Sequence, residues 1–464
     1  MTSALNKPMV LELGGRELTV GSPASIGLWS LWCIAFVVVL GMADVFFGTI
    51  ITGLEEADRH WLEGDALSYY HIAIGEQSVL EREPLHPMIL RGSIHLFGHP
   101  EPTTPRQHSE NHLLVRHTSA WVGLVMIGMI GVLATRVAGR FAGIAAMTVY
   151  SVSVYPLYFA ITGLRQTTMG VLALGLIWFF ILRVQSKPAK VFRWTGLALC
   201  AAALPLVRMS SLAVVPMIAT CYVALGFAWR RGTEGWKRRI MEAGIVAAVA
   251  WVAASPFLVA CKVHRGRFFS VMVPHAKYYR NQEFAGQPGY PTAQEVADDP
   301  YTGDDLTPGQ YILGHHDVPE IAHRYVLGYW KSFTKHLGPT FAASIGDDTT
   351  LVWWKVVPYW FWPLGVVVCF WGWRRPMLVV PAMFIVQFPF AFIVPLNVHL
   401  PGGAVLGVGY RFSMSMAPLM AVLIGAGLSA PLHVAVWGVG KAASQDEKNR
   451  DEKKKKTAKN KRRR

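Results

Sequence analysis

An acidic residue, Asp65, follows the first long apolar stretch of the chain and comes shortly before the segment Pro84-Leu85-His86-Pro87. Tyr69 and Ala73 follow Asp65 at intervals of four residues, so a helix would align all three on one face, which we expect to face a cavity. Carboxylates transfer protons in catalysis, and we therefore base the functional hypothesis on Asp65. The alternative is that Asp65 caps a helix by accepting a backbone N–H.

Other ionisable residues offer secondary sites. Asp44 lies toward the outer end of the first apolar stretch, where an acid is costly, so it either serves catalysis or cation binding or pairs with a neighbouring helix at the interface. Of the histidines before the second apolar stretch, His108 and His112 could share a helical face and bind a metal. No cysteine or carboxylate spacing completes such a site, so we expect solvated loop histidines and predict no metal ligands. The histidines concerned are His95, His99, His108, His112 and His117.

The composition is that of a membrane protein. Apolar residues make up 52% of the 464 residues and charged residues 16%, a balance too apolar for a soluble domain. Stretches of about 20 apolar residues, long enough to cross a hydrocarbon core of about 30 Å, recur along the chain. The sequence therefore predicts an all-α, polytopic transmembrane helix bundle of about ten spans. The expected spans are 26–51, 118–133, 141–161, 167–182, 194–206, 212–229, 240–260, 352–371, 377–396 and 414–439.

Lysine and arginine gather at alternate ends of these spans. Cytoplasmic loops retain an excess of positive charge, so this distribution sets the expected orientation. Both termini are then cytoplasmic, and two long loops, about 54–117 and 261–350, lie on the non-cytoplasmic side. We expect prolines to exclude regular structure between Pro84 and Pro105, and an amphipathic helix from Pro319 to His336.

We expect one membrane domain, residues 1–440, followed by a basic, disordered cytoplasmic tail, residues 441–464. The tail carries 12 basic and 4 acidic residues, so it supplies +8 of the net charge of +15. Such a run binds anionic membrane lipids weakly. No aromatic residues interleave its lysines, so we expect no nucleic-acid binding.

Several motifs, taken in order, resemble the C-type (GT-C) membrane glycosyltransferases, the superfamily that holds protein O-mannosyltransferases and lipid A aminoarabinose transferases. The resemblance covers most of the chain. Its pieces are Asp65-x-x-x-Tyr69-x-x-x-Ala73, Arg82-Glu83-Pro84-Leu85-His86-Pro87, Arg116, Leu164-Arg165, Leu206-Val207-Arg208, and Tyr410-Arg411 with Pro418. One position departs from the pattern: several members follow the Asp with Glu, and here that position is Ala66, with Glu63 as the nearest substitute.

The resemblance implies transfer of a sugar from a polyprenyl-phosphate donor to a lipid, glycan or protein acceptor, on the non-cytoplasmic face of a bacterial inner membrane. Such a reaction needs a carboxylate to remove the proton of the attacking nucleophile, and Asp65 is the predicted base. It also needs cations against the departing phosphate, whose oxygens guanidinium groups match in paired geometry. Arg208 and Arg411 are the predicted phosphate ligands, with Arg82 and Arg165 as secondary ones.

An arginine without a partner in hydrocarbon costs at least about 2.5–3.5 kcal/mol, so an anionic group should lie beside Arg208 and Arg411. The alternative is that both reach lipid headgroups. The residues predicted to contact substrate are Tyr69, His86, Asp44 and Tyr410. The sequence leaves the need for a divalent metal open.

Two other classes of function remain as alternatives. A transporter of a small solute or lipid would carry ionisable residues through the middle of several spans, whereas those of this chain lie mostly near span ends. A non-catalytic scaffold would act through its basic tail. Deleting residues 441–464 would then abolish function, and Asp65→Asn would spare it.

Overall fold

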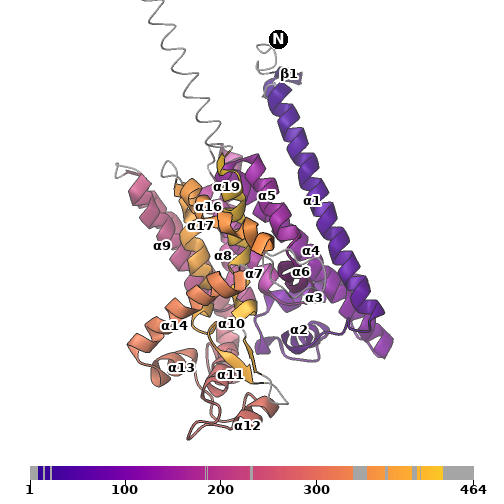
Figure 1. Ribbon diagram of the computed structural model, residues 1–464, viewed down its shortest axis with the longest axis vertical. Helices are drawn as coiled ribbons and strands as arrows, with labels where there is room; N and C mark the ends of the chain where they lie inside the picture. The colour runs from indigo at the N-terminus through magenta and orange to yellow at the C-terminus, as the bar shows by residue number, and fades with distance from the viewer. Residues whose placement is uncertain are drawn as a thin grey trace, which may run out of the picture.

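The computed structural model describes residues 9–13, 16–20, 23–182, 184, 186–229, 234–337, 353–370, 375–399, 405–407 and 409–431. These residues form a bundle of helices, with α1 (Pro23–Glu56) along one side and shorter helices at one end (Figure 1). We call the end at which α2 (Gly64–Ile74) and α11 (Val273–Phe284) lie the loop end. The predicted tail, 441–464, lies outside the described residues.

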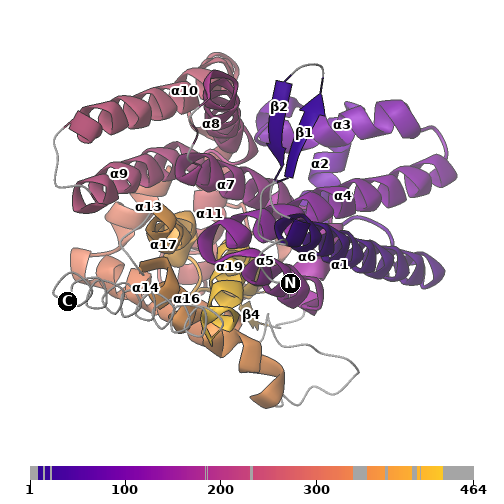
Figure 2. The ribbon, with the colours of Figure 1, turned by 90° about the horizontal axis from the view of Figure 1, so that it is seen from above.

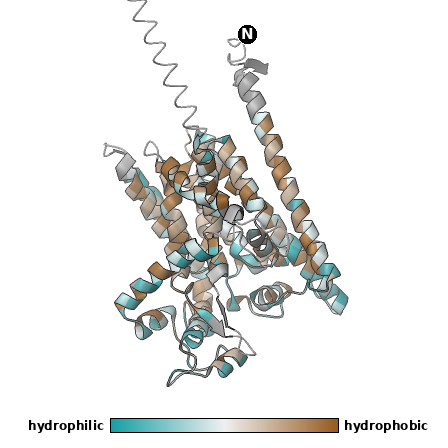
Figure 3. Ribbon diagram, in the orientation of Figure 1, coloured by the Kyte–Doolittle hydropathy of each residue, from teal (hydrophilic) through white to brown (hydrophobic). Residues whose placement is uncertain are grey.

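Within the described ranges, four helices are long and apolar enough to cross a membrane: Trp29–Glu56 of α1, α4 (Pro105–Ala138), α8 (Lys187–Val207) and Trp236–Arg265 of α10 (Glu234–Arg265). Shorter apolar helices accompany them: α7 (Gln166–Ile181), α9 (Ser211–Trp229), α16 (Trp362–Phe370), α17 (Val379–Ala391) and α19 (Ala417–Leu428). Hydrophilic residues are most frequent at the loop end (Figure 3). The chain is a multi-pass, largely helical membrane protein, as its composition predicts.

Several predicted spans are interrupted. The span predicted over 141–161 is divided into α5 (Arg140–Ser151) and α6 (Val154–Ile161). The span predicted over 352–371 begins as a 3-10 helix, η4 (Trp353–Phe361), which contains Pro358, a residue without a backbone N–H. Two antiparallel hairpins correct the all-α prediction: β1 (Met9–Leu13) pairs with β2 (Arg16–Val20), and β3 (Asn397–His399) pairs with β4 (Val405–Gly407).

The first predicted loop is mostly helical. Residues 98–104 are irregular, as expected, but the expectation is wrong directly after Pro84. A helix, α3 (Leu85–Phe97), begins there, because Pro84 and Pro87 fall before and within its first turn, where a missing N–H breaks no intrahelical hydrogen bond. The next helix, α4, begins well before the predicted span because Thr104 caps it. Thr104 and Gln107 accept each other's backbone N–H at 3.3 Å, which completes a capping box.

The position of α2 is set by its packing against α3 and α4. Tyr69 and Ala73 are buried on its inner face, with 0% and 2% exposure. Arg116 of α4 donates hydrogen bonds to the carbonyl oxygens of His60 at 2.7 Å and Trp61 at 2.9 Å. These bonds fix the chain immediately before α2 and thereby the position of Asp65.

The second long loop folds into α11, α12 (Ala293–Asp298), α13 (Pro308–His315) and α14 (Val318–Lys331). The amphipathic helix predicted over 319–336 is present as α14, which ends at Lys331 and continues as a π-helical turn, Ser332–Leu337. Asp317 caps α14 by accepting the N–H of Glu320 at 2.7 Å.

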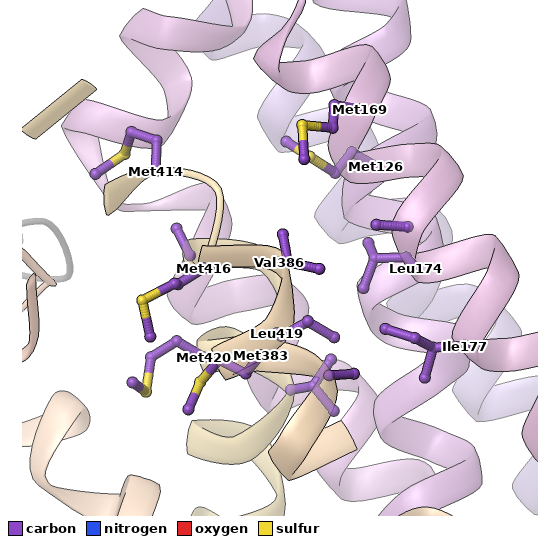
Figure 4. Packing of buried hydrophobic residues seen from close by; sticks show 14 of the residues in the cluster. Met126, Met169, Leu174, Ile177, Met383, Val386, Met414, Met416, Leu419 and Met420 are labelled. Carbon is purple, nitrogen blue, oxygen red and sulfur yellow. The ribbon is translucent and has the colours of Figure 1, made fainter. Parts of the chain in front are cut away.

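The bundle core lies between α4, α7, α17 and α19, and the view from above shows α7 near the centre of the bundle (Figure 2). Methionines from several of these segments, including Met126, Met169, Met383 and Met420, converge there (Figure 4). Their flexible side chains fill irregular gaps between helices. At Gly365 of α16 an added Cβ would collide with a backbone carbonyl of α19, so only glycine permits this approach.

Candidate active site

Asp65 is the centre of an ion-pair cluster at the loop end. It lies in the first turn of α2, and its side chain is 20% exposed. Its Oδ1 accepts a hydrogen bond from Arg82 at 2.9 Å, and its Oδ2 accepts one from Arg411 of α18 (Gly409–Ser413). The N-cap position of α2 is Glu63, which makes no side-chain cap bond. Capping therefore does not account for Asp65.

Arg82 is also held by α11. His275 donates from Nδ1 to the carbonyl oxygen of Val271 at 3.1 Å, which leaves Nε2 as an acceptor 3.4 Å from Arg82. Burial, followed by the charge of Arg165, lowers the pKa of His275 to about 4. The imidazole is therefore neutral at neutral pH, in the tautomer that accepts from Arg82.

The two arginines control the basicity of Asp65. Burial raises the pKa of Asp65, but the charges of Arg411 and Arg82 together lower it by more, so the pKa lies well below its usual value. The carboxylate is ionised at neutral pH, and it is a weak proton acceptor as long as both arginines bind it.

A second carboxylate, Glu83, lies directly after Arg82 and is 5% exposed. It accepts a hydrogen bond from Arg165, which is 3% exposed and precedes α7. Its other oxygen accepts the backbone N–H of Met209 at 3.0 Å. Burial raises the pKa of Glu83, but the charge of Arg165 and the other polar groups around the carboxylate, among them the N–H of Met209, together lower it by more, so the pKa lies below its usual value. Glu83 and Arg165 thus form a buried, neutral pair.

Arg208 directly follows α8, and its side chain makes no hydrogen bond or ion pair within the part of the chain that the structure describes. Its guanidinium carbon lies 3.9 Å from the ring centre of Phe390 and 5.9 Å from that of Phe412. Burial, followed by the charge of Arg165, lowers the pKa of Arg208 to about 9, so it stays protonated at neutral pH. Arg208 is therefore a cation without an anionic partner.

The Arg208 side chain lines a cavity of about 110 Å³ at the loop end. Other residues that line it are Glu83, Ser210, His275, Tyr279, Tyr311 and Phe392. The Ser210 hydroxyl is buried and makes no hydrogen bond there. A smaller hollow of about 10 Å³ is lined by both Arg208 and Arg411, so the cavity adjoins the Asp65 cluster.

The charges of these six side chains do not balance. Four guanidinium groups (Arg82, Arg165, Arg208, Arg411) and two carboxylates (Asp65, Glu83) leave a sum of 4 − 2 = +2. A buried excess of positive charge is stabilised by an anion. The arrangement is suited to a ligand that carries one or two negative charges, and phosphate is the group that guanidinium clusters match best.

Two of the predicted substrate contacts, Tyr69 and His86, are packed into the protein. Tyr69 is 0% exposed, and the guanidinium carbons of Arg82 and Arg165 lie 6.0 Å and 5.9 Å from its ring centre. His86 is 3% exposed, with its ring nitrogens 3.1 Å from Thr168 Oγ1 and 2.8 Å from a carbonyl oxygen. Both residues position the cluster and offer no free polar atom to a ligand, apart from the buried Tyr69 hydroxyl.

The other two predicted contacts are not placed in the cluster. Asp44 is exposed on α1, and no hydrogen bond or ion pair joins it to any other described residue. The side chain of Tyr410 lies outside the described side chains. Of the predicted phosphate ligands, Arg82 and Arg411 bind Asp65, Arg165 binds Glu83, and Arg208 alone is unpaired, among the residues described.

Two of the histidines before the second span, His108 and His112, have structural partners, which corrects the expectation that they are solvated, whereas His95 and His117 are exposed, as expected. His112 accepts the backbone N–H of Leu62 at 2.9 Å, and His108 lies 2.8 Å from the Tyr70 hydroxyl. Both lie on the early turns of α4, which the sequence did not predict to be helical. They hold α2 against α4.

One group of described residues has the spacing of metal ligands: Glu283, His316 and Glu320, at the loop end. Arg324 pairs with Glu283 at 2.5 Å, and the Tyr311 hydroxyl also donates to it. A guanidinium at this position opposes a bound cation, so we interpret the group as an ion-pair network that joins α11, α13 and α14.

Sequence reasoning missed three residues of the site. Glu83 stands inside the motif Arg82 to Pro87, and its burial beside two arginines could have been suspected from that position. His275 and Tyr279 come from α11, in the second loop, where no spacing or composition pointed to them.

The fold and the site together define a multi-pass helical membrane protein with a buried, positively charged site at one end of the bundle. No protein-family model and no curated protein sequence matches the chain. Its structure is similar to the crystal structure of ArnT from Cupriavidus metallidurans bound to undecaprenyl phosphate, with 13% sequence identity, 88% of this chain and 78% of that chain covered, and a TM-score of 0.37. The TM-score is low, so the residues of the site carry the functional argument.

Proposed function

We propose that the chain is a glycosyltransferase that moves a sugar from a polyprenyl-phosphate donor to an acceptor on the non-cytoplasmic face of the membrane. The observation that carries the proposal is that an acid, Asp65, bound to Arg411, lies close to an unpaired cation, Arg208, which lines an aromatic cavity. The first supplies a proton acceptor and the second an anion site, which are the two groups that such a transfer needs.

The charge of the site supports a phosphate-linked donor. A sugar phosphodiester carries one negative charge, and the polyprenyl phosphate that leaves carries up to two. The site has an excess of two positive charges. The site is thus complementary to the charge that develops on the leaving group. Because it stabilises the departing phosphate more than the intact donor, it lowers the barrier to transfer.

The transfer is a displacement at the anomeric carbon of the sugar. The acceptor O–H or N–H attacks the anomeric carbon, the bond from that carbon to the phosphate oxygen breaks, and its electron pair stays on the phosphate. The acceptor proton passes to Asp65. Arg208, with Arg411, faces the phosphate and stabilises its second negative charge.

Asp65 becomes a competent base only when the donor is bound. In the free protein both of its oxygens bind arginines, which lowers its pKa. We propose that the donor phosphate draws Arg411, whose side chain is 35% exposed, away from Asp65. The freed oxygen then accepts the acceptor proton. The protein would in this way avoid activating an acceptor before a donor is present.

The test uses the purified protein in lipid nanodiscs and a panel of polyprenyl-phosphate-linked sugars. We expect one donor to release polyprenyl phosphate in an acceptor-dependent manner. A failure of every donor to bind would overturn the proposal. Flux of an intact solute across proteoliposomes would favour the transporter alternative.

A further inference from the structure

The two carboxylate oxygens of Glu83 have different partners. One accepts from Arg165, and the other accepts the backbone N–H of Met209 at 3.0 Å. Met209 directly follows Arg208, so this second bond holds the peptide group that carries Arg208. It connects the segment before α3 to the turn between α8 and α9, across 126 positions of the chain.

This turn determines where the Arg208 side chain points. Arg208 has extended backbone angles, φ −153° and ψ 116°, between the last turn of α8 and the first turn of α9. Its own N–H donates to the carbonyl oxygen of Leu204 at 3.0 Å, and its carbonyl oxygen accepts the N–H of Ser211 at 2.9 Å. The N–H of Met209, the residue directly after Arg208, also belongs to this turn, and Glu83 supplies its acceptor.

Glu83 also determines which arginine is left without an anion. Arg165 and Arg208 both line the cavity, and each guanidinium disfavours the charge of the other. Pairing with Glu83 neutralises Arg165. Arg208 rests instead on the face of Phe390, a contact that a guanidinium makes without losing its charge.

We infer that Glu83 is a positioning residue for Arg208: it fixes the Arg208–Met209 peptide, so that the guanidinium points into the cavity, and it neutralises Arg165, so that Arg208 is the cation that meets the donor phosphate. This inference rests on the proposed function. It adds that the phosphate site is organised by a buried carboxylate that does not itself contact the donor.

Two double variants separate the roles of Glu83. E83Q/R165M and E83M/R165M each remove one positive and one negative charge, so the net charge of the site is unchanged. Only the glutamine of E83Q/R165M retains an oxygen that can accept the N–H of Met209. The comparison therefore isolates the bond to the turn from the charge of the pair.

The measurement is binding of farnesyl phosphate, a short polyprenyl phosphate, to the purified full-length protein in nanodiscs. We expect E83Q/R165M to bind within about threefold of wild type and E83M/R165M to bind at least about tenfold more weakly, the loss that follows when a buried donor is released. Adding Arg208→Met to E83M/R165M should cause no further loss, because Arg208 would no longer point at the phosphate.

Each outcome has a distinct meaning. If wild type binds no farnesyl phosphate, the proposed function fails. If wild type binds it and both double variants bind it equally well, the function stands and the positioning role of Glu83 is overturned. If E83M/R165M does not fold, E83N/R165M replaces it, because asparagine is polar but too short to reach Met209. Tight binding by that variant would also overturn the inference.

Discussion

Asp65 and Arg411 are joined by an ion pair across 346 positions of the chain. One belongs to α2, near the start of the first long loop, and the other to α18, shortly before the last apolar helix. Their contact brings together, at the site, two segments that are far apart in the chain. It also places an anion where an incoming phosphate must compete for the same guanidinium.

This competition predicts a difference between two pH profiles. In the free protein the lowered pKa keeps Asp65 ionised at acidic pH, so kcat/KM for the donor should stay level from about pH 8 to about pH 5. In the donor complex Arg411 turns to the phosphate and the pKa of Asp65 rises. The acid limb of kcat should therefore lie at higher pH than that of kcat/KM. If the acid limbs of kcat and kcat/KM lie at the same pH, Arg411 does not move from Asp65 to the donor phosphate.

Removal of the charge of Asp65 should separate catalysis from binding. Asp65→Asn cannot take the acceptor proton, so we expect kcat to fall by about 10²–10⁴-fold. Donor affinity should be equal or higher, because Arg82 and Arg411 lose their anionic partner. Steady-state transfer and donor binding are measured on the same preparation. Asp58→Asn is the matched control, because the Asp58 side chain is 84% exposed. If Asp65→Asn transfers sugar as fast as Asp58→Asn does, Asp65 has no part in the mechanism.

The sequence predicts much of this architecture because local composition determines it. Apolar length predicts the helices, and Arg208 and Arg411 are identified as candidates by the motifs that resemble the glycosyltransferase family and by their positions beside apolar spans. Pairing between Asp65 and Arg411 depends on tertiary packing, which no spacing reveals. The same applies to Glu83 and Arg165, 82 positions apart. The sequence did not predict the helix breaks within apolar stretches. Hydropathy indicates only which residues can lie in lipid, whereas prolines and local contacts determine where a helix ends.

Arg208 should govern donor binding through its guanidinium geometry. Arg208→Met removes the unpaired cation, and the loss of a charged hydrogen bond should raise the donor KM by about 10- to 100-fold. Arg208→Lys keeps the charge but loses both the planar fork and the stacking on Phe390, so its KM should be intermediate. Arg106→Met, at a side chain that is 88% exposed, is the control for loss of one arginine. Equal donor KM values for Arg208→Met and this control would contradict the assignment.

His86 should make the fold sensitive to acid. Burial lowers its pKa to about 4, from about 6.5 in an unfolded chain. Between these values the unfolded chain binds the proton and the folded chain does not, so stability falls as pH drops from about 6.5 to about 4. His86→Gln retains hydrogen-bonding groups toward Thr168 and Gly163 without titrating. We expect a weaker decline of Tm with acidification in this variant. An unchanged decline would mean that other groups, such as His275, account for it.

Gly328 should be essential for the docking of α14 on the bundle. A Cβ at this position would collide with the carbonyl oxygen of Ala391 in α17, a part of the backbone that cannot rotate away. Gly328→Ala must therefore push α14 outward or shift α17, which carries Phe390, the ring beneath Arg208. We expect a loss of about 1–3 kcal/mol in stability, together with a higher donor KM.

The control for Gly328→Ala is Gly314→Ala, on the neighbouring α13, where an added Cβ meets nothing within 4 Å. Alanine favours helix over glycine by up to about 1 kcal/mol, so this variant should have an equal or higher Tm and an unchanged donor KM. The two substitutions are chemically identical, and only Gly328→Ala should lower Tm. If Gly328→Ala instead behaves like Gly314→Ala, the close approach of α14 to α17 is not required for the site, and the position of Phe390 must be fixed by the bundle alone.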